Sequence, residues 1–231
     1  MYERLKQLIA DLDAMGIQPF ICYGNPDAKI LIVGKECAWE EESDDWKKFY
    51  KPNFSQWKAS FNGHGFGFAH GGQPYDFDHG FHPIHPFYCQ CNTLKKNSCK
   101  TSNTYYYYQR LVDMIRDNES RKFIDFFKDC FITELNEDCR LSNKGLEKSQ
   151  RKKTEDNIRM RFDWMRKTNF FNQFKVVILA CGPYADAIKE DKVLQKDLFG
   201  DAHVCYCHQL SFWDKDLDEE IPKIQQCLKE L

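Results

Sequence analysis

Four short runs of apolar residues alternate along the chain with segments that have a helical pattern. The first run, 30–33, has no polar alternation, which favours a strand covered on both faces. Similar runs predict the other strands, so the expected strands are 29–34, 131–135, 175–181 and 204–207. This alternation of strands with helices predicts an α/β domain whose sheet is mainly parallel and has about four strands.

Apolar residues three or four positions apart predict the helices. In the segment 3–15 this stripe consists of Leu5, Leu8, Ile9 and Leu12, and Gly16 follows it as a stop signal. The same spacing predicts helices at 104–117, 119–128, 154–168, 184–190 and 217–230. Of the four consecutive tyrosines at 105–108, we expect at least two in the core.

The segment 36–103 interrupts this pattern. It is rich in Gly, His, Phe, Pro and Asn, and only the region near 44–50 has a helical pattern. Long irregular segments inside a compact domain are usually functional loops. We therefore expect 1–231 to form a single domain with a long insertion at about 36–103 that belongs to its functional site.

Composition narrows the class of protein. A chain of 231 residues can bury a substantial core, and a net charge of -2 gives no global electrostatic preference for nucleic acid, although a local basic patch is compatible with it. The first residues have the pattern of an amphipathic helix rather than of a signal peptide, and no apolar stretch reaches membrane-spanning length. Eleven cysteines without an export signal indicate a reducing compartment, so we expect a cytoplasmic monomer without membrane contact.

Polar residues follow the predicted strands. Asn136 and His208 come directly after two of them, Glu36 lies two residues after a third, and Gly182 follows the fourth. In parallel sheets the ligand crevice lies beyond the carboxyl ends of the strands, so an acid, an amide and an imidazole should meet at one edge. The alternative for each residue is a loop position that caps a helix or faces water.

The order of elements resembles that of the uracil-DNA glycosylase superfamily. The sequence Val-Gly-Lys-Glu-Cys-Ala at 33–38 lies where the family has Gly-Gln-Asp-Pro-Tyr or Gly-Glu-Ala-Pro-Gly, and His-Gln-Leu-Ser at 208–211 lies where it has His-Pro-Ser. The second strand, which ends at Asn136, is similar to the family strand whose terminal Asn contacts the base. The segment around Phe68 resembles the one that supplies a stacking Phe. Cys37 and Gln209 stand where the family has prolines.

This resemblance implies a three-layer α/β/α fold and a DNA glycosylase that hydrolyses the N-glycosidic bond of uracil or a related damaged base, with no cofactor. Phe68 would stack on the extruded base, and Asn136 would read its polar edge by donating and accepting at once. His208 would stabilise the departing base, while Glu36 would stabilise the cationic sugar and orient water. Gly34 and Ser211 complete the expected base-binding set.

Other interpretations stay open. The basic run could contact phosphates or form only a solvated face; its candidate residues are Lys144, Lys148, Arg151 and Lys152. A non-catalytic protein that binds a nucleobase, a nucleotide or nucleic acid could have the same fold. A metal site is a third hypothesis, and its candidate ligands are His82, His85, Cys89 and Cys91. Their spacing fits no common zinc pattern, which favours a loop that packs on the sheet.

Overall fold

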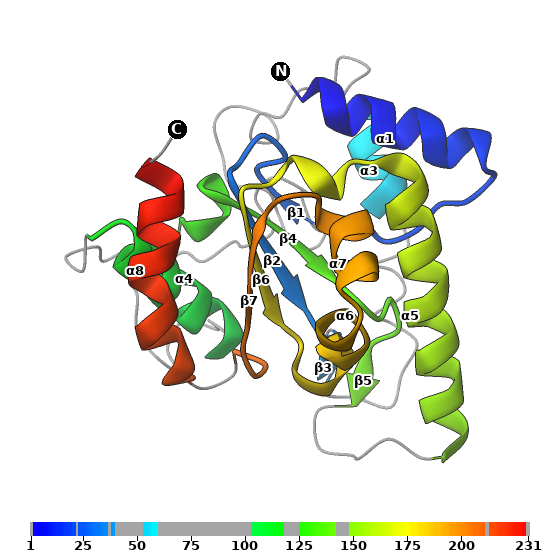
Figure 1. Ribbon diagram of the computed structural model, residues 1–231. Coiled ribbons are helices and arrows are strands. Elements are labelled where there is room, and N and C mark those ends of the chain that lie inside the picture. The colour runs from blue at the N-terminus through cyan, green and yellow to red at the C-terminus, as the bar shows by residue number, and fades with distance from the viewer. Residues whose placement is uncertain are drawn as a thin grey trace.

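The computed structural model describes residues 2–21, 23–36, 38–39, 53–59, 103–117, 125–141, 148–210 and 213–229. Within them the central sheet has five strands in the order β1-β4-β2-β6-β7 (Figure 1). Four of them run parallel to one another, namely β2 (Ile30–Gly34), β4 (Cys130–Glu134), β6 (Val176–Ala180) and β7 (His203–Tyr206). All four strands predicted from the sequence are therefore confirmed.

The prediction of a four-stranded sheet was too small by one strand. β1 (Tyr23–Gly24) pairs antiparallel with β4 and makes the sheet mixed. A strand of two residues has no hydrophobic period, so its sequence carries no signal. Gly24 has φ +101, and a Cβ at this position would lie 2.4 Å from the carbonyl oxygen of Cys130. Only glycine lets the chain approach β4 this closely.

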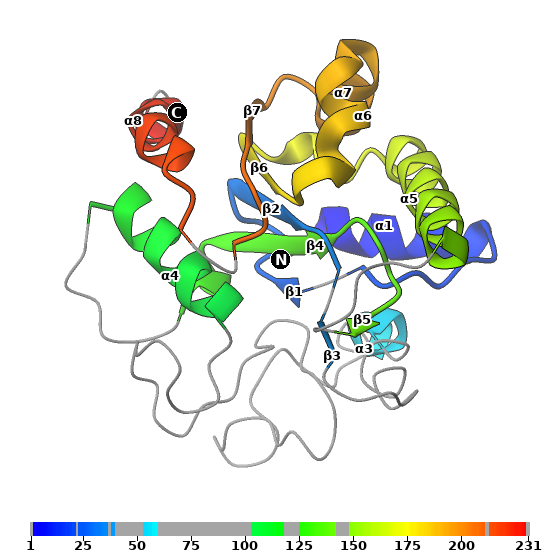
Figure 2. The same ribbon diagram turned by 90° about the horizontal axis from the view of Figure 1, so that it is seen from below.

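Helices lie on both faces of the sheet (Figure 2). One face is covered by α4 (Asn103–Ile115) and α8 (Asp216–Lys229). The other face is covered by α1 (Glu3–Ala14), α3 (Asn53–Ala59), α5 (Lys148–Thr168), α6 (Asp186–Glu190) and α7 (Lys192–Phe199). Alternate strand residues pack into the two layers, which explains why the strand sequences are apolar without interruption.

Most helices lie where the spacing predicts them. The predicted stripe of α1 is buried, and so are Tyr107 and Tyr108 among the four tyrosines of α4. α5 begins at Lys148, six residues earlier than predicted. The prediction missed its first turns because they are polar on all sides and have no hydrophobic period. α7 was not predicted. Of the segment 119–128 the described part forms only a 3₁₀ turn, Phe126–Lys128, and 44–50 lies outside the described residues.

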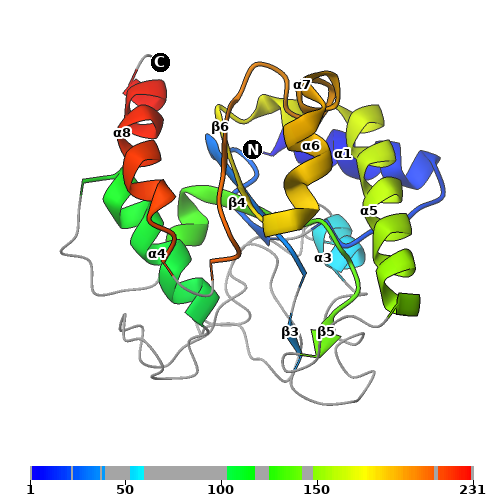
Figure 3. The same ribbon diagram turned by 60° about the horizontal axis from the view of Figure 1, so that its bottom comes forward.

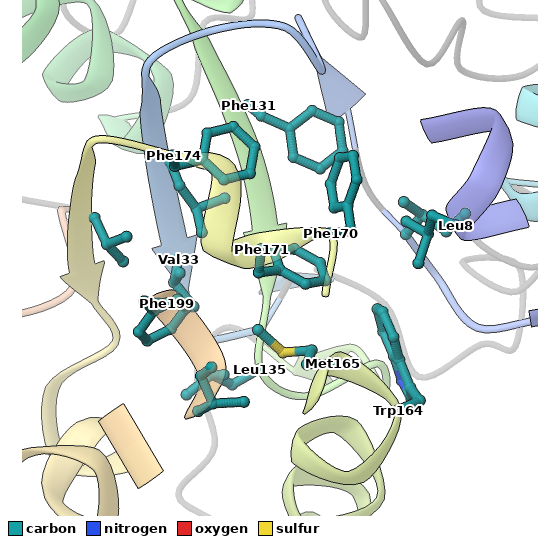
Figure 4. Close-up of a cluster of buried hydrophobic side chains, with 14 of the residues drawn as sticks. Leu8, Val33, Phe131, Leu135, Trp164, Met165, Phe170, Phe171, Phe174 and Phe199 are labelled. Carbon is teal, nitrogen blue, oxygen red and sulfur yellow. The ribbon is translucent and has the colours of Figure 1, made fainter. Parts of the chain in front are cut away.

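Aromatic side chains fill much of the layer between the sheet and α1, α5 and α7 (Figure 4). Phe131 of β4 stacks on Phe174 with ring centroids 6.0 Å apart, and Phe170 meets Phe171 edge to face at 5.1 Å. Trp164 of α5 extends this cluster through Phe171. In this layer the aromatic residues of the chain form core rather than a binding surface.

The parallel strands bring their carboxyl ends to one edge of the sheet (Figure 3). Beyond β2 and β4 the ladder continues, because the N–H groups of Leu135 and Asn136 donate to the carbonyls of Gly34 and Lys35. Farther out, β3 (Ala38–Trp39) pairs in parallel with β5 (Arg140–Leu141). The chain that follows β2 is thus held against the chain that follows β4.

Candidate functional site

Glu36 and Asn136 meet at this edge of the sheet. The extended ladder between β2 and β4 places them side by side, and Asn136 Nδ2 lies 3.4 Å from Glu36 Oε2. Both residues are buried, with exposed fractions of 6% and 4%. A buried carboxylate next to a buried amide needs compensating partners, which the neighbouring segments supply.

Two cations face the other oxygen of Glu36. Lys35 Nζ lies 3.5 Å from Oε1, and Arg140 Nη1 lies 3.6 Å from the same atom. Lys35 is the preceding residue on the chain, whereas Arg140 reaches the carboxylate from β5. Both separations are longer than an ordinary charge-assisted hydrogen bond, so the two cations balance the charge without fixing Oε1 tightly.

Tyr184 covers this cluster from the turn that follows β6. Lys35 Nζ lies 4.7 Å from the centroid of its ring, a cation–π contact. Its hydroxyl is buried and faces Glu36 and Thr154, without a hydrogen bond of ordinary geometry within the described residues. Burial, and then the neighbouring Glu36 carboxylate, raise the pKa of the Tyr184 hydroxyl. The phenol therefore stays a neutral donor beside the carboxylate.

The amide of Asn136 is held on its oxygen side. Oδ1 accepts from the backbone N–H of Asp138 at 3.2 Å and from Asn157 Nδ2 at 2.9 Å. Asn157 lies on α5 and also donates to Asp138 Oδ2 at 3.0 Å. Lys153, one turn earlier on α5, lies 2.7 Å from the same Asp138 oxygen. A row of polar side chains thus runs from the surface of α5 to Glu36.

Gly34 lies beside a second carboxylate. A Cβ at Gly34 would lie 2.5 Å from Glu134 Oε2. The side chain that fills the space beside this glycine therefore comes from the neighbouring strand β4. Glu134 pairs with Gly34 in the register between β2 and β4. Sequence reasoning took Gly34 as a base-binding residue and placed Glu134 only within a strand.

His208 lies at the same edge but not in the same cluster. It follows β7, which β6 separates from β2, so the backbones of β2 and β7 are about 10 Å apart. Its backbone N–H donates to Asp214 Oδ2 at 2.7 Å, and the residue is exposed. Within the described residues the contacts of Glu36 do not include His208. The structure thus joins the predicted acid and amide and places the imidazole two strands away.

The remaining predicted residues fall into two groups. Lys148, Arg151 and Lys152 are exposed on the first turns of α5, next to the contact of Lys153 with Asp138. The others lie outside the described residues, and they are Phe68, His82, His85, Cys89, Cys91, Lys144 and Ser211. In the part of the chain that the structure describes, no group of three or more His, Cys, Asp or Glu residues could hold a metal ion.

Five residues near Glu36 and Asn136 were not predicted as site residues from the sequence. They are Lys35, Glu134, Arg140, Asn157 and Tyr184. Only Lys35 had a usable signal, since it adjoins Glu36. Asn157 is 21 positions from Asn136 and lies within a polar helix, where one more amide has no special pattern.

Comparison with known proteins identifies no relative: no family model, no curated protein and no solved structure matches this chain. Within the described residues, no helix is both long enough and apolar enough to span a membrane. Any functional conclusion therefore depends on the chemistry of the cluster around Glu36 and on the motifs quoted above.

Proposed function

We propose that this chain is a nucleobase-recognising hydrolase of the uracil-DNA glycosylase type. It would have the three-layer α/β/α fold of that superfamily and cleave the N-glycosidic bond of uracil or a related damaged base. The contact between Asn136 Nδ2 and Glu36 Oε2, 3.4 Å long, carries this proposal. It pairs a carboxylate with an amide at the carboxyl edge of adjacent parallel strands, where α/β proteins bind ligands.

In this proposal Glu36 acts on the sugar. Hydrolysis of an N-glycosidic bond develops positive charge on the sugar and requires a water molecule on the opposite side from the departing base. The carboxylate would stabilise that charge and orient the water through Oε2, the oxygen that faces neither Lys35 nor Arg140. His208, across the edge, would contact the departing base; Phe68 and Ser211 keep their predicted roles of stacking and base binding.

The basic run of α5 supports a nucleic-acid substrate. Lys148, Arg151 and Lys152 are exposed, and the next residue, Lys153, reaches Asp138 in the row that leads to Glu36. Cations beside the carboxyl edge would contact the phosphates that flank an extruded nucleotide. This local patch makes a DNA partner compatible with the chain's overall charge of -2.

The test is cleavage of a uracil-containing oligonucleotide. Purified protein should generate abasic sites, and Glu36→Gln should lower kcat/KM by about 10²–10³ because it removes the charge that stabilises the transition state. Arg159→Gln, an exposed change on α5, is the matched control and should retain activity. If the wild type produces no abasic product from uracil or from a panel of damaged bases, the hydrolase proposal fails.

A second candidate is a non-catalytic protein that binds a nucleobase or nucleotide at the same site. The charge balance around Glu36 favours it, because Lys35, Arg140 and Glu36 together carry a net charge of +1. A net positive cluster opposes a cationic transition state but does not oppose a neutral base or an anionic nucleotide. Glu134, close to Gly34, reduces this excess.

Thermal stabilisation distinguishes the two candidates. A binding protein should gain a higher Tm with deoxyuridine or a short uracil oligonucleotide and yield no product on long incubation. Asn136→Ala should abolish that gain, while Arg159→Gln should preserve it. Stabilisation that survives loss of both Asn136 and Glu36 would show that the ligand binds elsewhere.

A further inference from the structure

Polar side chains also gather at the amino edge of the sheet, the end opposite to Glu36. Lys29 comes directly before β2 and Lys175 directly before β6, and the N–H of Lys175 donates to the carbonyl of Lys29 at 2.8 Å. The start of α1 lies at this edge (Figure 1), where the N–H of Tyr2 donates to Asp27 Oδ2 at 3.2 Å. A strand rises about 3.3 Å per residue, so Lys29 lies roughly 20 Å from Glu36. The amino edge is therefore distinct from the candidate site.

These segments surround an open hollow of about 600 Å³, here called the amino-edge hollow. Three cations from three different segments line it, namely Arg4 in the first turn of α1, Lys29 and Lys175. All three are exposed, and in the part of the chain that the structure describes none of them has an ion-pair partner. Cavities of this size accommodate small-molecule ligands.

The two carboxylates that also line the hollow already have partners. Glu3 Oε1 lies 2.7 Å from Nζ of Lys6, and Asp27 accepts the N–H of Tyr2. Three cations against two carboxylates give the lining a net charge of +1, and Lys6 beside Glu3 raises the local excess to +2. This charge favours an anion in the hollow.

Two further features of the hollow offer hydrogen-bond donors. Gln173 ends the 3₁₀ turn Phe171–Gln173, and within the described residues its buried Nε2 has no hydrogen-bond partner. An unpaired buried donor costs free energy, which an acceptor on a ligand would recover. α1 begins at the hollow without a side-chain cap, so the partial positive charge of its N-terminus adds to that of the cations.

We propose that the amino-edge hollow binds a small ligand through a phosphate monoester group. Such a group carries a charge of about −1.5 to −2 at pH 7 and three oxygens that accept hydrogen bonds. It therefore matches the local excess of +2 and the donors that come from separate segments. Cationic side chains and helix N-termini are the groups with which proteins commonly bind phosphate. The hollow would bind this ligand whether or not the chain cleaves glycosidic bonds.

The carboxylates favour a small ligand over a nucleic-acid strand. A strand presents a row of phosphodiesters, each with one negative charge, and binds best to an uninterrupted stripe of cations. Glu3 and Asp27 interrupt the cations of the hollow. A single phosphate monoester concentrates its charge in one place and can approach the cations without lying along the carboxylates.

The first experiment measures Kd by calorimetry with the full chain at low ionic strength. The probes are inorganic phosphate, ribose 5-phosphate and ribose, which contain no base and so do not report on base binding near Glu36. We expect both phosphate-bearing probes to bind and ribose not to bind. Tighter binding of ribose 5-phosphate would identify a phosphorylated organic ligand, and equal binding would identify free phosphate. No binding of either probe, or equal binding of ribose, would overturn the proposal.

Variants of the two lysines locate the bound phosphate. Lys29→Gln and Lys175→Gln should each raise the Kd about fivefold, because each removes one exposed charged contact. The double variant should raise it at least about tenfold. Lys215→Gln changes the net charge equally at an exposed position directly before α8 and should leave the Kd unchanged. An unchanged Kd in the double variant, or an equal loss in Lys215→Gln, would overturn the proposal.

Gln173→Met separates binding from stability. It keeps the length of the side chain, removes the Nε2 donor and should raise the Kd about fivefold. The urea midpoint of the ligand-free protein should stay the same or rise, because a buried donor without a partner is removed. A variant that merely loosened the fold would lower this midpoint. A lower midpoint with an unchanged Kd would overturn the role of Gln173 in binding.

A single-stranded oligonucleotide without terminal phosphates tests the nucleic-acid alternative. We expect the double variant Lys29→Gln, Lys175→Gln to leave the affinity for this oligonucleotide unchanged. If the double variant weakens oligonucleotide binding as much as it weakens binding of ribose 5-phosphate, the hollow contacts a nucleic-acid backbone and the proposal of a phosphate monoester fails.

Discussion

The two halves of the carboxyl edge are built differently. At the β2–β4 half, Glu36 and Asn136 are buried and joined to side chains from β5, α5 and the turn after β6. At the β6–β7 half, the Gly182 N–H donates to the carbonyl of Cys207, the His208 N–H donates to Asp214 Oδ2, and His208 is exposed. In the proposed site the buried first half would be preorganised, whereas the exposed His208 side chain would lose conformational freedom when it contacts a ligand.

The largest expected effect comes from comparing the two halves directly in the cleavage assay. Glu36→Gln should lower kcat/KM by about 10²–10³, since in the proposed mechanism this buried carboxylate lies where positive charge develops. His208→Ala should cost less, about tenfold, because ordering an exposed side chain offsets part of what it contributes. Equal losses in the two variants would show that both halves are preorganised to the same degree.

Two glycines provide a comparison of stability. Gly34→Ala should lower the free energy of unfolding by about 1 kcal/mol, because the flexible end of the Glu134 side chain must move away from the new Cβ. Gly182→Ala should cost about 1 kcal/mol from its φ of +54 alone, since a Cβ there meets no atom within 4 Å. Urea unfolding measures both. Adding Glu134→Ala should rescue only the Gly34 variant, and rescue of neither would contradict the steric explanation.

Buried thiols at the β6–β7 half should make stability fall in alkali. Burial raises the pKa of Cys205 to about 12 and raises the pKa values of Cys181 and Cys207 as well. Groups whose pKa is raised on folding stabilise the protein fully below their unfolded pKa and lose that contribution as the pH rises above it. At one pH unit above 9, each of these thiols should lower the free energy of unfolding by about 1 kcal/mol. Urea midpoints between pH 8 and 10.5 test this, with Cys205→Ala as comparison; a flat profile would count against it.

The smallest effect concerns Glu220, where α8 meets β7. Hydrogen bonds from Lys223, and then from His203, lower the pKa of the Glu220 carboxyl. A carboxylate with a lowered folded pKa stabilises the protein above its unfolded pKa and loses this contribution as the pH falls through the folded value. Glu220→Gln should lower the free energy of unfolding by only a few tenths of a kcal/mol, about the usual size for partly exposed pairs near the surface. The difference from wild type should shrink in acid unfolding as the pH falls below the ordinary pKa of a glutamate, and a difference that grows there would contradict this assignment.

The sequence by itself determined the four parallel strands, most of the helices and the placement of Glu36 and Asn136 at the ends of two of those strands. These features follow from local periodicity and from the fact that parallel strands end at one edge, so no long-range information is needed. The two-residue β1 and the polar start of α5 could not be predicted from the sequence, because neither has a hydrophobic period.

Only the tertiary structure decided which groups surround Glu36 and how the Asn136 amide is oriented. Arg140, Asn157 and Tyr184 come from three different elements, and their meeting depends on how α5 and the turn after β6 pack over the sheet. The orientation of an amide is set by the donors and acceptors that reach it in space. Those partners come from positions that no local pattern in the sequence connects.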